Sequence, residues 1–478
     1  MDPGPLQIAI MGHPNAGKSS VVATLTENDS IGIGNTPGTT TRSDRYPVTI
    51  DGRTLIEFID TPGFQNPGDL LEWFKVHRDE ENVAAAFIRT HESNELYVHD
   101  CELLRPVSEG AGIILVIDGS TRIRQKDRDE IELLRLTRRP RMAILNNMTD
   151  RENYQSQWDS ELRMSFNSVR EFNAHRATYA ERIDLLNAMK SIEQGWEPRF
   201  KLAISAFEED WDNRIDQTIE TIVDLFRTVL EYKVSKRVDP EKVSTRTGEK
   251  RVRTQLVKRL EEGIRRFEKS AQQEIRAHFR HNVWNVPPGS LLMEDLFSEQ
   301  VSHGLGLSKA QLAVAGMAAG GIAGGLLDTT TAGVTLGAFA LLGAAGGGVT
   351  AWIGGSALTR MDIQRMLGSV RVTVGPVSRD GFLFVLLDRI LLYCARAMNW
   401  SHGRQGADED AANRVPEKRL EPAGFAQDLS ASQRKSMVRF FAAARKGRDS
   451  PAEEAFREIL GTTLHELSVG TIDSREGV

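Results

Sequence analysis

The chain has 478 residues, of which 26% are charged and 40% hydrophobic, and its formal net charge at pH 7 is -6. The length allows two or three domains, the composition is that of globular proteins, and the negative balance gives no support for nucleic-acid affinity of the whole chain. The two cysteines, Cys101 and Cys394, form no CxxC pair, which argues against a disulfide framework or a cysteine metal site and favours a reducing compartment.

The N-terminus, Met1–Pro5, lacks the basic start and apolar core of a signal peptide. We therefore expect the N-terminal domain in the cytoplasm, or on the cytoplasmic side of a membrane. The apolar run that follows, Leu6–Met11, has the pattern of a buried strand and leads directly into the first motif.

Residues 12–20, GHPNAGKSS, lie between that strand and a helix predicted to begin near Ser19. They contain the pattern G-x-x-x-x-G-K-S, in which glycines let backbone NH groups converge on phosphate oxygens and the helix adds its positive dipole end. We expect Lys18 to reach the terminal phosphates of a nucleotide and the Ser19 hydroxyl to bind Mg²⁺. The other predicted nucleotide-binding positions of the loop are His13, Pro14, Asn15, Ala16, Gly17 and Ser20.

A second buried-strand pattern, Leu55–Ile59, ends in the sequence DTPG at residues 60–63. There Asp60 is predicted to hold Mg²⁺ through water, and the Gly63 NH to sense a γ-phosphate. Upstream lies a polar loop with three consecutive threonines, long enough to close over the metal. We expect Thr41 to supply the second hydroxyl ligand, with Thr40 as the alternative.

Base recognition is predicted after the strand Met142–Leu145, in the sequence NNMTD. A carboxylate can accept both hydrogens from the N1 and N2 edge of guanine, which adenine cannot offer. We expect Asn147 and Asp150 to read the base; an alternative register pairs Asn146 with Thr149 and lacks the carboxylate. The run LAI at residues 202–204 is interpreted as a further strand, with Ser205 and Ala206 after it as the second base contact.

As a set, GHPNAGKSS, TTTR, DTPG, ILVIDGS, NMTD and SA resemble the Era and TrmE kind of translation-factor-related P-loop GTPases, in the TRAFAC class. The resemblance covers roughly residues 6–228 and is to the bacterial type fused to a helical C-terminal region. It implies an α/β GTPase domain with a doubly wound, mostly parallel sheet, and Mg²⁺-dependent hydrolysis of GTP to GDP. It also implies two switch loops that change with the nucleotide.

Two residues depart from that family's pattern. Met148 stands where the N-K-x-D motif has lysine, which predicts weaker or less selective guanine binding because the charge is lost. Phe64 cannot position a water, so the resemblance implies slow turnover unless a partner, dimerisation or K⁺ assists. Asn15 matches the asparagine that coordinates K⁺ in potassium-activated members; a hydrogen bond within the loop is the alternative role.

Long segments of helical character separate the motifs. One lies between Phe64 and the strand at Gly112–Asp118, and it enlarges the second switch into a surface suited to a protein partner. Another is expected between Asp150 and Ser205. Both are interpreted as extra core or lid.

Beyond the GTPase domain, residues 231–300 are predicted to be a basic amphipathic linker. Lys233–Lys269 holds 13 Lys or Arg against 6 Asp or Glu, and apolar residues recur at helical spacing from Leu256 to Phe279. Two interpretations stay open: a solvated helix packed by its apolar stripe, or a face for anionic lipid headgroups or RNA.

Residues 301–360 are predicted to form a Gly/Ala-rich helical hairpin. Residues 310–327 and 332–359 carry no charge, and glycines recur every four residues, which lets helices approach closely. Each half is near the length of about 20 residues that a bilayer requires, so membrane insertion through residues 310–359, at the inner membrane, is one interpretation. A soluble glycine-zipper hairpin is the other.

The last part, residues 361–478, is predicted to be mainly helical, after an alternating strand at Val370–Val374. An apolar helix is expected at Phe382–Met398, a polar loop at 401–422, and two closing helices near 430–445 and 451–467. With residues 1–230 as GTPase domain, the chain is interpreted as a nucleotide-dependent switch acting on a membrane- or partner-binding region. A ribosome or RNA assembly GTPase and a nucleotide-binding module with little hydrolysis are the alternatives.

Overall fold

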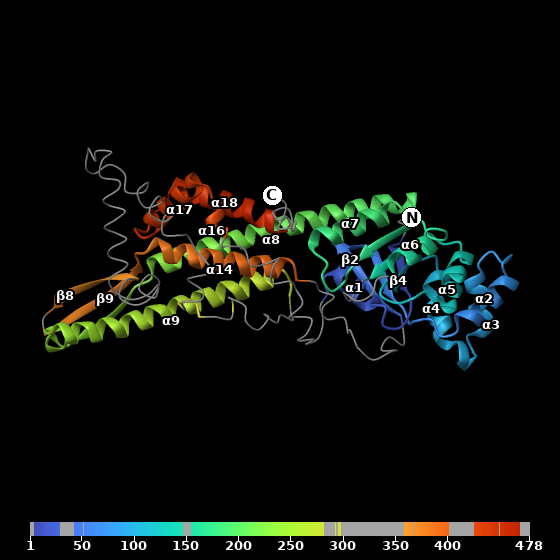
Figure 1. Ribbon diagram of the computed structural model, residues 1–478, viewed down its shortest axis with the longest axis horizontal. Coiled ribbons are helices and arrows are strands. Elements are labelled where there is room, and N and C mark those ends of the chain that lie inside the picture. The colour runs from blue at the N-terminus through green and yellow to red at the C-terminus, as the bar shows by residue number, and fades with distance from the viewer. Residues whose placement is uncertain are drawn as a thin grey trace.

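The computed structural model describes residues 4–28, 43–50, 52–146, 154–281, 292, 295–297, 358–366, 368–400, 425–448 and 450–468. The molecule is elongated, with an α/β body at one end and a helical rod at the other, as Figure 1 shows. Thr40, Thr41, Asn147, Asp150, the glycine-rich segment as far as residue 357 and the polar loop at 401–422 lie outside the described residues.

The α/β body is built on a six-stranded sheet in which five strands are parallel and β2 runs antiparallel to β3. Along β1 the side chains alternate between two cores: Ile8 and Ile10 belong to one, Ala9 and Met11 to the other. The predicted doubly wound, mostly parallel sheet is confirmed. Its order is β2 (Asp44–Ile50), β3 (Arg53–Asp60), β1 (Leu6–Met11), β4 (Gly112–Asp118), β5 (Arg141–Asn146) and β6 (Ser168–Phe172).

Helices cover both faces of this sheet. The core on one face is completed by α1 (Lys18–Thr26), α7 (Tyr179–Lys190) and the first turns of α8 (Glu197–Glu231). The opposite core takes side chains from α2 (Pro67–Val76), α3 (Val83–His91), α4 (Val98–Ser108), α5 (Gln125–Leu136) and α6 (Gln155–Leu162). The short 3-10 turns η1 (Glu95–Tyr97) and η2 (Gln194–Trp196) join these helices.

The 35-residue helix α8 is shared by the two bodies. Phe200 and Ile204 are buried in the core of the α/β body, whereas Ile222, Phe226 and Leu230 are buried in the core of the rod. Since an α-helix of this length spans about 50 Å, one rigid element connects the two cores. The predicted domain boundary at residue 230 therefore assigns to the first domain a stretch of α8, from Trp211 to Leu230, whose buried side chains belong to the rod core.

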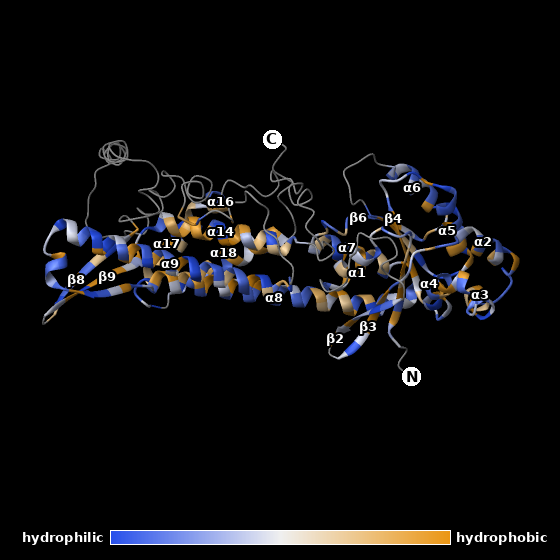
Figure 2. Ribbon diagram, turned by 90° about the horizontal axis from the view of Figure 1, so that it is seen from below, coloured by the Kyte–Doolittle hydropathy of each residue, from blue (hydrophilic) through white to orange (hydrophobic). Residues whose placement is uncertain are grey.

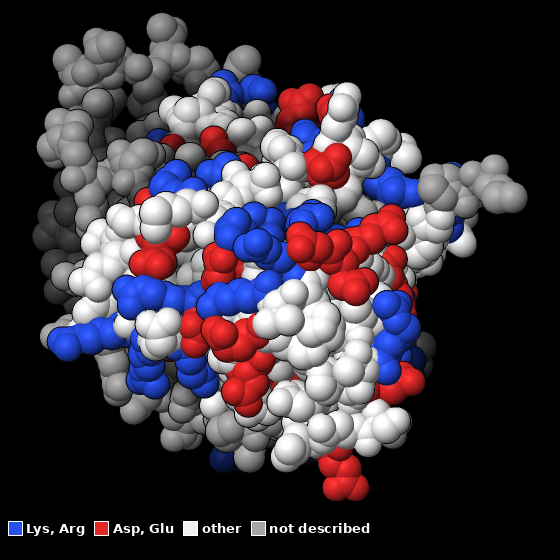
Figure 3. Space-filling model, turned by 90° about the vertical axis from the view of Figure 1, so that its right-hand side faces the viewer, with Lys and Arg blue, Asp and Glu red and all other residues white. Residues whose placement is uncertain are grey.

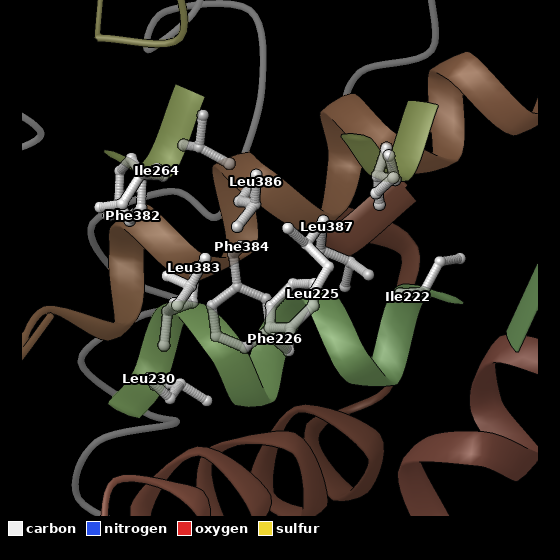
Figure 4. Close-up of a cluster of buried hydrophobic side chains, with 14 of the residues drawn as sticks. Ile222, Leu225, Phe226, Leu230, Ile264, Phe382, Leu383, Phe384, Leu386 and Leu387 are labelled. Atoms are coloured by element: carbon white, nitrogen blue, oxygen red, sulfur yellow. The ribbon is translucent and has the colours of Figure 1, made fainter. Parts of the chain in front are cut away.

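The rod packs the apolar stripes of α8 and of five further described helices together with a small sheet. Side chains of α8, α9 and α14 meet at its centre in Figure 4, and α14 is predominantly hydrophobic in Figure 2. The helices are α9 (Arg246–His278), α14 (Asp380–Met398), α16 (Phe425–Asp428), α17 (Ala431–Ala444) and α18 (Pro451–Ser468). The antiparallel sheet has the order β7 (Val234–Val238), β9 (Ser369–Val377), β8 (Thr359–Met366), and η3 (Pro240–Val243) leads into α9.

The C-terminal predictions are largely confirmed. The amphipathic helix, the alternating strand, the apolar helix and the two closing helices correspond to α9, β9, α14, α17 and α18. Residues 231–300 were predicted to be a linker, but α9 is instead part of the rod, where Leu256, Leu260 and Ile264 are buried in its core. The predicted hairpin is wrong at its end, because Thr359 and Arg360 belong to β8 and pair with β9. Among the described residues no helix is long and apolar enough to cross a bilayer.

Candidate nucleotide-binding site

The loop between β1 and α1 has the backbone geometry that its glycines predict. Gly12 and Gly17 have φ of 137° and 88°, and Asn15 also lies in the left-handed region at 66°. A Cβ on Gly12 would lie 2.2 Å from the carbonyl oxygen of Val116 in β4, so only glycine fits there. The loop therefore packs tightly against the sheet. Its backbone NH groups lie just before the N-terminus of α1, where an anion is favoured.

Lys18 is buried at the first position of α1, and its ammonium donates a hydrogen bond of 3.1 Å to the His13 carbonyl. Burial lowers the pKa of Lys18, and the negative charges of Asp60 and Glu130 partly oppose that shift. The side chain thus reaches back across the loop to its second residue. A polyanion bound there would favour the charged ammonium by supplying the opposite charge.

The Ser19 hydroxyl donates a hydrogen bond of 2.6 Å to Asp60 at the end of β3. The two predicted metal-binding groups therefore lie together, although they are 41 positions apart in the sequence. A hydroxyl and a carboxylate are oxygen ligands of the kind that Mg²⁺ prefers, so these residues fit the ion. Thr41, the third predicted ligand, lies outside the described residues.

Gly63 lies directly against the phosphate loop. A Cβ on this residue would meet the Pro14 ring at 2.6 Å, so a side chain here would push the two loops apart. Phe64 is buried in the core next to α2, which agrees with the expectation that it does not position a water. The Gln65 amide nitrogen instead donates to the Gly63 carbonyl at 3.4 Å.

His13 points toward α5. Its Nε2 lies 3.2 Å from both Asp127 and Glu130, so the imidazole links the phosphate loop to this helix. Burial raises the pKa of Glu130 well above its ordinary value. A cavity of about 240 Å³ lies between the loop, the end of β4 and the start of α5.

The base-recognition end is organised by Asn146, the last residue of β5. This side chain is fully buried; its amide nitrogen donates to the Ala16 carbonyl at 2.9 Å, and its amide oxygen accepts from the Ala174 NH at 3.1 Å. It thus ties the phosphate loop to the loop after β6. This geometry favours the alternative register of the base-recognition motif, in which its first and fourth positions are Asn146 and Thr149.

Ser205 and Ala206 do not follow a strand, contrary to our expectation for the second base contact. The run at residues 202–204 is part of α8, so both residues lie within a continuous helix. The sixth strand is β6, which the sequence analysis missed by expecting only helices in this interval. The loop after it, beginning at Asn173, occupies the corresponding place beside the phosphate loop: the Thr24 hydroxyl donates to the Ala174 carbonyl at 3.0 Å, and Ser20 lies 3.3 Å from His175.

We expect Asn146→Ala to weaken GDP and GTP binding by about tenfold or more, because two buried backbone groups lose their partner at about 1–3 kcal/mol each. Asn147→Ala is the matched control and is expected to change the affinity less than about threefold, a small fraction of one such hydrogen bond. Calorimetric titration with each nucleotide measures both variants. If Asn147→Ala lost more nucleotide affinity than Asn146→Ala, the register with Asn147 and Asp150 would be the correct one.

Two family models match the chain. Residues 7–147 match "50S ribosome-binding GTPase", and residues 161–462 match "Domain of unknown function (DUF3482)". The sequence is 31% identical over 145 residues to the tRNA modification GTPase MnmE of Lactobacillus delbrueckii, covering 30% of this chain and 25% of that protein. It is 32% identical over 126 residues to GTPase Era of Ureaplasma parvum, covering 25% and 41%.

Similarity to solved structures is limited to part of the fold. The crystal structure of a point variant of Aquifex aeolicus Era bound to GDP.AlF4- has 15% identity and a TM-score of 0.30, over 57% of this chain and 89% of that one. The chain spans only about a quarter to two fifths of the lengths of the MnmE and Era relatives. The matched GTPase model covers residues 7–147, the part of the chain that contains the phosphate loop.

Proposed function

Because the chain belongs to the DUF3482 family, and its N-terminal part is a P-loop GTPase domain homologous to those of Era, Der and MnmE, we propose that it is a GTP-driven switch acting on its C-terminal rod. It binds GTP and hydrolyses it to GDP and phosphate. The observation that supports this most directly is the Ser19–Asp60 hydrogen bond beside Lys18, which joins the phosphate loop to DTPG.

The chain's own groups account for phosphate binding. The loop amides and the start of α1 face the β-phosphate, and Lys18 bridges toward the γ-phosphate. Ser19 and Asp60, with Thr41 as the proposed third ligand, hold Mg²⁺, which lowers the negative charge on the phosphates. The Gly63 NH is proposed to donate to the γ-phosphate, so that loss of this group would free the DTPG loop to change its conformation.

Hydrolysis is proposed to be slow without a cofactor or partner. Phe64 is buried and Gln65 is turned back onto the Gly63 carbonyl, so neither presents a group to an attacking water. Asn15 has left-handed backbone angles and is exposed. Because it is exposed, its side-chain amide is available to coordinate K⁺. A second cation there would offset charge that develops on the phosphates in the transition state.

Phosphate release from GTP is the test. We expect hydrolysis that requires Mg²⁺ and is faster in KCl than in NaCl at the same concentration, with Asn15→Ala abolishing the difference. Equal rates in both salts would remove the K⁺ proposal and leave the GTPase proposal standing. No phosphate release in any salt, with GTP binding intact, would instead support a nucleotide-binding module.

The switch is proposed to act through the junction where α8 and α9 meet the GTPase domain. Glu27 directly follows α1, upstream in the sequence of Thr41, and its carboxylate contacts Arg182, Arg214 and Arg280. These arginines belong to α7, α8 and the residues after α9. A change in the threonine loop can therefore be transmitted to the rod.

We propose that the rod's target is a membrane, reached through residues 310–327 and 332–359, which carry no charge. Such runs are long enough to enter a bilayer. The protein would then be cytoplasmic with an attachment to the inner membrane. The matched model "50S ribosome-binding GTPase" supports a second candidate, binding to ribosomes or RNA. Sedimentation of full-length protein with ribosomes, or flotation with lipid vesicles, separates the two.

A further inference from the structure

The small sheet of the rod has one packed face and one open face. Val370, Val372 and Val374 of β9 are buried against α8 and α9. Side chains alternate along a strand, so the residues between these valines lie on the opposite face. This open face is defined by Ser235 and Arg237 of β7, Arg371 and Thr373 of β9, and Asp362 and Gln364 of β8.

Two arginines face each other across this sheet. Arg237 is directly opposite Arg371 in the antiparallel register, and Gln364 is the next residue in the same row. Among the described residues neither guanidinium forms an ion pair. Like charges directly opposite one another repel, so an anion bound between the two guanidinium groups would stabilise the pair.

The polar groups near the arginines leave the positive charge largely uncompensated. In the next row the Ser235 and Thr373 hydroxyls bond to each other at 2.8 Å, and Asp362, the acidic residue of this face, accepts from Gln364 at 3.2 Å. Lys233 precedes β7 on the same side as Ser235. The face therefore offers planar guanidinium donors beside hydroxyls, a combination that suits phosphate oxygens.

The chain outside the described residues favours a lipid phosphate over other sources. The second uncharged run ends at Thr359, which is the first residue of β8. Gln364, in the arginine row, lies five residues further, or about 17 Å along an antiparallel strand. A run that can enter a bilayer is thus joined directly to the arginine-bearing sheet.

At the opposite end of the molecule, formed by the α/β body, positively charged side chains are not concentrated in the same way. Lys and Arg are interspersed with Asp and Glu over the face shown in Figure 3. Mixed charges of this kind give little net attraction to a charged surface. We propose that the open face of the β7–β9–β8 sheet docks on the anionic headgroups of a phospholipid bilayer. This inference rests on the proposed membrane function and assigns its contact surface.

Vesicle flotation of the full-length protein tests it. Wild type is expected to bind phosphatidylcholine vesicles containing phosphatidylserine, and Arg237→Gln/Arg371→Gln to bind them on the order of 20-fold less, since each basic residue at an anionic surface contributes about fivefold. Arg89→Gln/Arg170→Gln is the control: it removes two exposed arginines from the GTPase domain and is expected to bind like wild type.

The outcomes separate the inference from the proposed function. Wild-type binding that the double variant retains would overturn the docking face and leave the membrane proposal standing. No vesicle binding by wild type in either the GDP or the GTP-analogue state would overturn both. A double variant that loses binding to single-stranded RNA but keeps vesicle binding would assign the face to RNA instead. The melting temperature of the double variant should equal or exceed that of wild type, because the two replaced side chains repel one another.

Discussion

Lys18→Ala is expected to abolish measurable GTP hydrolysis and to weaken GTP binding by about 2–5 kcal/mol, the cost of removing one partner from a buried charge pair. The ammonium is buried in the phosphate loop, close to Asp60 and Glu130, where its charge acts through little water. Alanine leaves the γ-phosphate without this cation, and a water molecule in its place would carry no positive charge. Calorimetric titration and phosphate release measure the two losses.

The folded state should tolerate this change. Burial lowers the pKa of Lys18, which means that the empty site disfavours the charged ammonium. The melting temperature without nucleotide should therefore stay near the wild-type value, while the increase in melting temperature on adding GTP is lost. Lys126→Ala removes an exposed lysine beside the same cavity and should retain that increase. GTP affinity of Lys18→Ala within threefold of wild type would refute the proposed site.

The phosphate half of the site could be predicted because its determinants are local. Gly12, Gly17, Lys18 and Ser19 lie within eight residues, and their spacing alone defines the loop, its positive φ angles and the start of α1. Asp60 was identifiable for a similar reason, since a continuous apolar run predicts the strand that ends there. Packing had only to bring the two segments together, as parallel neighbours in one sheet.

The base-binding half depended on elements that the sequence does not mark clearly. Strand β6 is at the sheet edge and mostly polar, with only Phe172 buried, so it lacks the apolar run of a central strand. The run at 202–204 looks like a strand but is one turn of α8, in which Leu202 faces solvent and Ile204 the core. The choice between Asn146 and Asn147 was also uncertain, because the sequence does not locate the end of a secondary-structure element to a single residue.

The second large effect is expected at Glu27. Its side chain is 4% exposed, and it is surrounded by Arg182 and Arg214, which are 4% and 5% exposed. Arg280 lies 3.4 Å away, and Asp210 supplies a second carboxylate to the group. Glu27→Gln keeps the shape but leaves two buried guanidinium groups short of one negative charge. We expect the free energy of unfolding to fall by about 3–5 kcal/mol, as when one partner of a buried ion pair is removed.

A thermodynamic cycle separates the ion pair from simple loss of packing. Glu27→Gln, Arg214→Met and the double variant are compared by denaturant unfolding, with Glu81→Gln as the exposed control. Because Arg214 lies on the helix that both cores share, the double variant should recover at least about 1 kcal/mol relative to the sum of the single losses. Additive losses would show that Glu27 and Arg214 are not coupled. They would also remove the proposed path from the threonine loop to α8 through this ion pair.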